Sequence, residues 1–183
     1  MPPLLRSASL AAVLLVVSAL PTSAQLLRFS GSGSFVGSDG PLPELVAASD
    51  GVSYEFVAVE ALPPVSATPT SKTYAALYAW VQLAGSRQYR LLIRPTITVT
   101  RDRVNANYGY FLHGKTANGW SFSHSAYSTD PSFVPAKLKL PKTTPEWPPG
   151  DGYAAGFVDL WGPKHQWHIY SDSGPWFEVE SIP

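Results

Sequence analysis

Hydrophobic and polar residues alternate along much of the chain with a period of two, the pattern of half-buried β-strands. The strictest example is residues 120–126, Trp-Ser-Phe-Ser-His-Ser-Ala, in which serines separate larger side chains. Residues 52–60 likewise put Val52, Tyr54 and Phe56 on one face. The pattern and the content of aromatic and β-branched residues predict strands over residues 52–60, 96–100, 107–113, 120–126, 137–140, 154–161, 166–170 and 176–181.

One segment fits two periods. Tyr74, Leu77, Tyr78 and Val81 form a helical stripe, so a short helix near 72–84 is one interpretation. Strands over 74–83 and 88–93, joined by Ala-Gly-Ser-Arg at 84–87, would instead make a hairpin. We favour the hairpin because the flanking segments also have the strand pattern.

Loops are indicated where Pro, Gly and Ser concentrate, at residues 30–43, 62–71 and 141–152. None of these stretches is long or charged enough to separate two domains. Many short strands with frequent turns predict an all-β, antiparallel single domain. The architecture is expected to be a β-sandwich, a jelly roll or barrel-like.

The N-terminal segment has the features of a secretory signal peptide. Arg6 precedes an apolar run from Ala8 to Leu20, and Ala24 is a small residue suited to a cleavage site. This run is shorter than the ~20 apolar residues that a membrane-spanning helix needs. We therefore expect residues 1–24 to be a signal peptide and residues 25–183 to form a secreted, extracellular β-rich domain with no membrane anchor.

Composition narrows the chemistry further. The 183 residues include no cysteine, which excludes disulfides, thiol nucleophiles and thiolate metal sites. Thirteen basic residues balance thirteen acidic ones, and loss of Arg6 with the signal peptide leaves 12 against 13, a net charge of −1. A balanced charge argues against binding to nucleic acid. We expect no cofactor.

Two motifs are weighed against their context. Residues 109–116, Gly-Tyr-Phe-Leu-His-Gly-Lys-Thr, fit the phosphate-loop pattern, but a strand-like centre and the turn signal Asn118-Gly119 predict a hairpin loop over 114–119 instead. His165 and His168 are three positions apart, and on a strand such residues point to opposite faces. No metal site is predicted.

The aromatic residues give the main functional signal. Val158 and Leu160 are expected to face the core, which would put Asp159 and Trp161 together on the outer face. An exposed aromatic ring beside a carboxylate suits the binding of sugar rings and their hydroxyls. The leading hypothesis is a secreted binding protein for carbohydrate or another extracellular ligand, such as a protein. Its predicted ligand-binding residues are Trp161, Trp167 and Trp176, which would stack, and Asp159 and Glu178, which would accept hydrogen bonds.

Two alternatives remain open. The chain could be a small hydrolase, lyase or isomerase that uses Asp159, Glu178 or His168 as acid and base groups, which requires at least two of these side chains to converge. It could also be an effector or wall protein that binds a macromolecule. The sequence favours a protein that is not an enzyme without excluding catalysis.

Arginines are also unevenly placed. Five of the six that follow the signal peptide lie between residues 87 and 103, at Arg87, Arg90, Arg94, Arg101 and Arg103. Such a cluster could bind an acidic partner, such as an anionic polysaccharide or a phosphoryl group. A solvated strand surface is the simpler interpretation.

Overall fold

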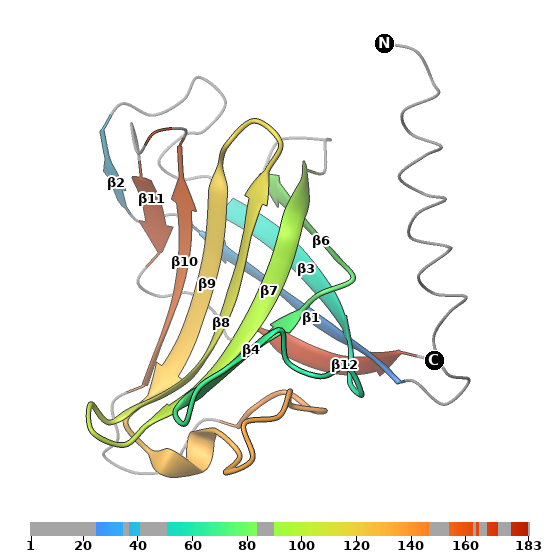
Figure 1. Cartoon of the computed structure of the whole chain (residues 1–183). Coiled ribbons are helices and arrows are strands. Elements are labelled where there is room, and N and C mark those ends of the chain that lie inside the picture. The colour runs from blue at the N-terminus through green and yellow to red at the C-terminus, as the bar shows by residue number, and fades with distance from the viewer. Residues whose placement is uncertain are drawn as a thin grey trace.

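Within the residues that the structure describes, the protein forms a twelve-stranded antiparallel sheet, and a short 3-10 turn follows the ninth strand (Figure 1). A computed structural model describes residues 25–34, 37–40, 51–83, 90–146, 154–162, 164, 168–171 and 177–182. The strands are β1 (Leu26–Ser34), β2 (Gly37–Asp39), β3 (Gly51–Val59), β4 (Ser66–Ala67), β5 (Ser71–Ala75), β6 (Tyr78–Leu83), β7 (Arg90–Asp102), β8 (Asn107–Thr116), β9 (Ser121–Ser128), β10 (Ala154–Trp161), β11 (His168–Ser171) and β12 (Glu178–Ile182). The helical turn η1 covers Pro131–Phe133.

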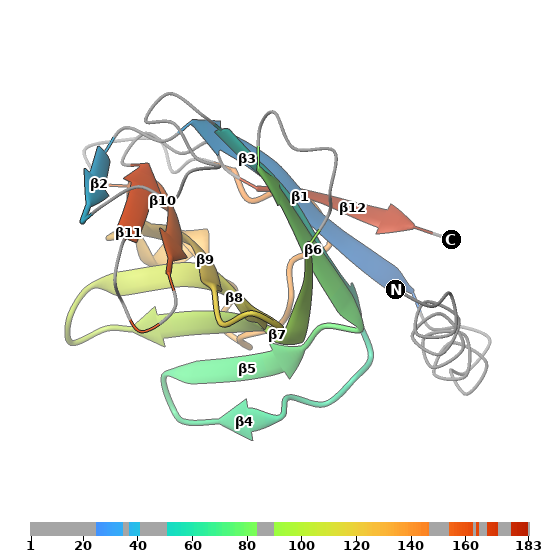
Figure 2. The ribbon, with the colours of Figure 1, turned by 90° about the horizontal axis from the view of Figure 1, so that it is seen from above.

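The sheet curls into a barrel-like ring. Its main strand order is β12-β1-β3-β6-β7-β8-β9-β10-β11-β2. β1 ends at Ser34 and β2 begins at Gly37, so these two strands on opposite sides of the sheet order lie close together in the chain. Figure 2 shows the ring end-on. The all-β antiparallel prediction is confirmed, and the structure has the barrel-like form rather than the two packed sheets of a sandwich.

The ambiguous segment at 72–84 contains two strands, so the alternative of a short helix there is wrong. β6 pairs with the start of β7, with Trp80 opposite Leu91, as a hairpin requires. However, Tyr74 lies in β5, which pairs with the far half of β7 opposite Ile97. Two residues separate β5 from β6, so the inward-facing positions of β6 are shifted by one relative to those of β5. This shift produced the helical spacing of apolar residues.

The interior of the ring is filled by aromatic side chains. Phe29, Tyr54, Phe56, Phe122 and Phe177 are all at most 1 % exposed. The ring centroids of Tyr54 and Phe122 lie 5.0 Å apart, and those of Phe29 and Phe177 lie 5.7 Å apart. The inward positions of the alternating strands therefore build the core, and the outward positions are left for other uses.

Residues 129–146 pass beneath one end of the ring (Figure 1, lower part). Strand side chains bind their backbone: the Tyr74 hydroxyl donates to the Leu138 carbonyl at 2.7 Å, and Arg101 donates to the Pro131 carbonyl at 2.9 Å. The buried Phe133 also anchors the segment. The predicted strand at 137–140 is wrong, because this stretch caps the ring rather than pairing with a strand edge.

The predicted signal peptide lies outside the described residues, and its cleavage stays a prediction. No helix in the described part of the chain has the length and apolar character needed to span a membrane.

Candidate functional site

A hollow of about 360 Å³ opens on the outer face of β12, β1, β3 and β6. Two aromatic side chains, small residues and a carboxylate surround it. We call it the Trp80 hollow; its lining residues are Ser30, Gly31, Ser32, Ser53, Tyr54, Trp80 and Glu178.

Strand register brings these residues together. Ser30 of β1 lies opposite Glu178 of β12 on one side and opposite Glu55 of β3 on the other. Glu55 in turn lies opposite Trp80 of β6. Cross-strand partners share a face, so four strands present these side chains outward together. Ser30 and Ser53 are small, which leaves a depression beside the indole of Trp80.

The carboxylate of Glu55 fixes the aromatic rings of β6. Its Oε1 accepts hydrogen bonds from Trp80 Nε1 at 3.2 Å and from the Tyr78 hydroxyl at 3.1 Å. The pKa of Tyr78 is raised by burial and then by the negative charge of Glu55. Trp80 is half-buried, so its ring has limited freedom to move.

Two further charges border this network. Arg28 of β1 forms an ion pair and hydrogen bond with Glu180 of β12, and that bond is the main cause of a raised Arg28 pKa. Glu55 contributes to the same shift. The carboxylates of this face are therefore partly balanced by one arginine.

The floor of the hollow connects with the core. A Cβ built on Gly31 would collide with the Tyr54 hydroxyl and lie 2.8 Å from Tyr54 Cζ, so only glycine leaves room for this tyrosine. The Tyr54 hydroxyl is hydrogen-bonded to His124 Nδ1. Burial raises the pKa of Tyr54 well above its usual value and lowers the pKa of His124 to about 3. Both side chains are therefore neutral at physiological pH.

The predicted ligand-binding residues lie in different places. Glu178 is exposed and lines the Trp80 hollow. Asp159 and Trp161 are half-buried on β10, and Leu160 between them is fully buried, so the predicted division of faces is confirmed for these positions. Trp167 and Trp176 lie outside the described residues.

The three residues of the catalytic alternative fall on two parts of the ring. His168 of β11 is the backbone partner of Trp161 on β10, and Asp159 lies two positions before Trp161 on the same strand. Glu178 lies on β12, with β1, β3, β6, β7, β8 and β9 between β12 and β10 in the sheet order. The structure thus brings Asp159 and the His168 position to one region and leaves Glu178 in another.

Trp80 is the site residue that sequence reasoning missed. The favoured strand over 74–83 already implies that Tyr78 and Trp80 share one face and that Ala79 and Val81 share the other, as observed, but it does not mark Trp80 as a site residue. No local signal placed Trp80 near Glu178, because β6 and β12 meet only through β1 and β3.

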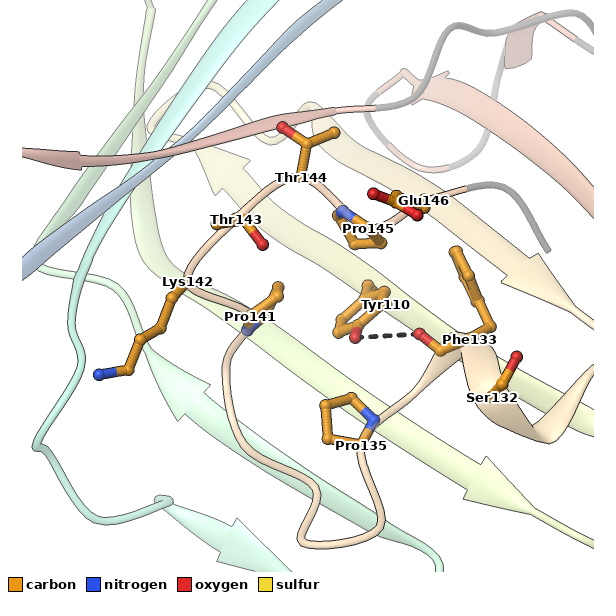
Figure 3. A pocket seen from close by; sticks show the side chains of 10 residues that line it. All are labelled: Tyr110, Ser132, Phe133, Pro135, Pro141, Lys142, Thr143, Thr144, Pro145 and Glu146. Carbon is orange, nitrogen blue, oxygen red and sulfur yellow. Dashed lines mark hydrogen bonds between the residues drawn. The ribbon is translucent and has the colours of Figure 1, made fainter.

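A second hollow of about 440 Å³ lies where residues 132–146 pass under the ring (Figure 3). Two of its polar side chains are engaged by the fold: the Tyr110 hydroxyl donates to the Phe133 carbonyl at 3.2 Å, and Thr144 Oγ1 accepts from the Val179 amide at 2.9 Å. Lys142 points away in Figure 3 and pairs with Glu60 at 2.7 Å. We assign this hollow to the closure of the ring.

Among the described residues, no group of three or more His, Cys, Asp or Glu side chains is placed to hold a metal ion. No known protein family, curated protein or solved structure matches the chain. Any assignment of function therefore rests on the chemistry of the hollow itself.

Proposed function

We propose that this is a secreted carbohydrate-binding protein and that a saccharide unit binds in the Trp80 hollow. An indole ring offers the flat apolar area on which the C–H face of a sugar can pack. The hydroxyls of Ser30 and Ser53 can donate and accept hydrogen bonds, and Glu178 can accept them from sugar hydroxyls. This combination of one apolar platform with a few polar groups is typical of small-molecule sites.

The observation that carries the proposal is the hydrogen bond from Trp80 to Glu55. It satisfies the indole N–H within the protein and holds the ring at a fixed angle beside the hollow. A ring that is fixed before binding loses little conformational entropy when a ligand packs on it. Tyr78 donates to the same oxygen, which further restrains the carboxylate.

The size of the hollow also fits. Ligand pockets range from about 300 to 1,000 Å³, and the Trp80 hollow has about 360 Å³. A small, open site predicts modest affinity for a short saccharide segment rather than enclosure of a long chain.

The test is a calorimetric titration of the purified protein with neutral oligosaccharides built from glucose, xylose, mannose or N-acetylglucosamine. We expect at least one series to bind and Trp80→Ala to weaken it about 30-fold, since a central aromatic contributes about 2 kcal/mol. Trp161→Ala is the matched control, because Trp161 lies on β10 away from the hollow. It should change affinity by less than about twofold.

Two results would overturn the proposal. One is the absence of binding by every neutral saccharide at millimolar concentration. The other is equal affinity of the wild-type protein and the Trp80→Ala variant, with both proteins folded by circular dichroism. Loss of binding in Trp161→Ala alone would move the stacking surface to β10.

A further inference from the structure

β7 contains a bulge where it pairs with β8. Ile93 lies opposite Lys115 and Thr96 lies opposite His113, so Arg94 and Pro95 together face a single residue, Gly114. Two residues opposite one define a β-bulge, a feature that redirects side chains and is common beside functional sites. Arg94 has φ = 50°, in the left-handed region that residues other than glycine rarely occupy. Such strain persists only where the surrounding structure holds it.

The bulge opens a hollow of about 420 Å³ on β7 and β8. It is lined by Ile93, Arg94, His113, Gly114, Lys115 and Thr116, and we call it the bulge hollow. Every titratable side chain in its lining is a base. Gly114 is required there, because a Cβ on it would lie 2.8 Å from Leu92 Cβ.

Two other arginines of the cluster near β7 have different surroundings. Arg90 lies over the Trp120 ring, with its Cζ 4.3 Å from the centroid. Arg101 donates to backbone carbonyls of the segment beneath the ring, at Pro131 and Val134. Within the described part of the chain, neither Arg94 nor Lys115 has an ion-pair or hydrogen-bond partner. Both cations are thus available to an external anion.

His113 also lines the bulge hollow. It lies between Thr96 of β7 and Ser123 of β9 in the sheet. Its pKa is lowered mainly by burial and also by the charge of Lys115, while a hydrogen bond to the Phe122 backbone opposes the shift. The imidazole can therefore serve as a neutral hydrogen-bond partner beside two fixed cations.

We propose that the bulge hollow binds a tetrahedral oxyanion, a phosphate or sulfate group, carried by an extracellular ligand. Arg94 can bind two oxygens with its planar guanidinium, and Lys115 supplies a compact charge. The exposed side chain of Ile93 (52 %) lines the hollow beside these cations and can pack against an apolar part of the ligand. This site is independent of saccharide binding at the Trp80 hollow.

The residues that match the phosphate-loop pattern do not form a phosphate loop. Gly114, Lys115 and Thr116 line the hollow, yet they belong to β8, and the turn begins only after Thr116. The predicted hairpin loop over 114–119 is therefore too long by its first residues. Anion contact would come from side chains projecting from strands, since no helix N-terminus follows to supply backbone N–H groups.

The test is a titration of the purified protein, at low ionic strength, with inorganic phosphate, inorganic sulfate, glucose 6-phosphate, glucose 6-sulfate and neutral glucose. We expect the oxyanions to bind and glucose to leave this hollow empty, with backbone amide shifts in 15N NMR confined to residues 92–94, 96 and 113–116. The phosphate and sulfate arms show which of the two groups is preferred.

Arg94→Gln/Lys115→Gln should weaken the binding about 30-fold or more, and each single variant about fivefold. The matched control is Arg103→Gln/Lys139→Gln, which removes two exposed cations outside the hollow and should change affinity by less than twofold. Trp80→Ala should leave oxyanion binding unchanged, so failure here and failure of saccharide binding are distinguishable. Absence of oxyanion binding at millimolar concentration, or equal losses in the two double variants, would overturn the proposal.

Discussion

Two groups of neighbouring strands, which we call walls of the ring, carry outward side chains of opposite charge. The Trp80 hollow, on β12, β1, β3 and β6, is bordered by a carboxylate and by an aromatic ring held by another carboxylate. The bulge hollow, on β7 and β8, is bordered by Arg94, His113 and Lys115. Both walls face inward with tightly packed apolar side chains. Core packing therefore constrains one face of each strand, and the other face can differ from wall to wall.

Both hollows also depend on a glycine. Each has a glycine in its floor, Gly31 or Gly114, at which a Cβ would strike an inner side chain, Tyr54 or Leu92. The walls differ in backbone: β1, β3 and β6 keep a continuous register, whereas β7 and β8 shift at the bulge. The first hollow thus results from side-chain sizes, and the second from an irregular backbone.

The largest expected effect comes from Gly31→Ala. The new methyl group must displace the fully buried Tyr54 ring and its hydrogen bond with His124. Overpacking and a lost buried hydrogen bond together predict a loss of about 3 kcal/mol in the free energy of unfolding. Urea denaturation measures this, with Ser30→Ala, the outward-facing neighbour, as the control that should change it by less than about 0.5 kcal/mol.

Gly114→Ala is the corresponding change on the other wall. It forces Leu92 away from β8 and should cost about 2 kcal/mol by overpacking alone, since no buried polar pair is broken. It should weaken oxyanion binding and leave saccharide affinity unchanged. Equal losses of stability in the two variants would contradict a special role for the Tyr54–His124 pair.

Acidification should act through that pair. His124 has a pKa of about 3 in the folded protein and about 6.5 in an unfolded chain, so below pH 6.5 the unfolded state binds a proton that the native state refuses. The contribution of neutral His124 is full above pH 6.5 and is lost as pH falls from 6.5 toward 3. At pH 4.5 the loss is about 3 kcal/mol.

Urea denaturation at several pH values tests this dependence against Tyr54→Phe/His124→Leu, which removes both buried polar groups. The carboxylates of the chain titrate in both proteins, so the difference between the two curves isolates His124. Parallel curves from pH 7 to pH 4.5 would show that His124 is not held neutral by burial.

The smallest expected effect separates two carboxylates of β12. Glu178 and Glu180 share the exposed face of that strand, but only Glu178 lines the Trp80 hollow. Glu178→Gln should weaken saccharide binding about fivefold, as expected for a hydrogen bond of about 1 kcal/mol. Glu180→Gln breaks the exposed pair with Arg28 and should leave affinity within twofold and Tm within about 2 °C. Equal effects of both changes in calorimetry would indicate general charge rather than contact.

Much of the fold could be predicted from the alternation of apolar and polar residues alone. The serines of residues 121–125 and the pair Asp159 and Trp161 lie on the faces that their positions predict. The segment at 72–84 was harder, because a two-residue break between β5 and β6 imitates a helical period. The predicted strand at 137–140 failed because its apolar residues pack against the end of the ring.

The candidate site could be predicted from the sequence only in part. Glu178 was selected from the sequence, but its neighbour Trp80 was not, and Asp159 was expected to join Glu178. Alternation fixes which face a residue occupies but carries no information on which strands become neighbours. That choice depends on the whole ring, in which β12 pairs with β1 at the opposite end of the strand order from β10.

The sequence by itself determined that the chain is all-β, that cysteine chemistry is absent, and which side of most strands is apolar. Only the tertiary structure decided that Trp80 and Glu178 share a hollow, and that Arg94 and Lys115 share another. The physical reason is the range of each interaction. The alternation of side chains depends on near neighbours in the chain, whereas strand pairing and bulges depend on contacts between distant segments.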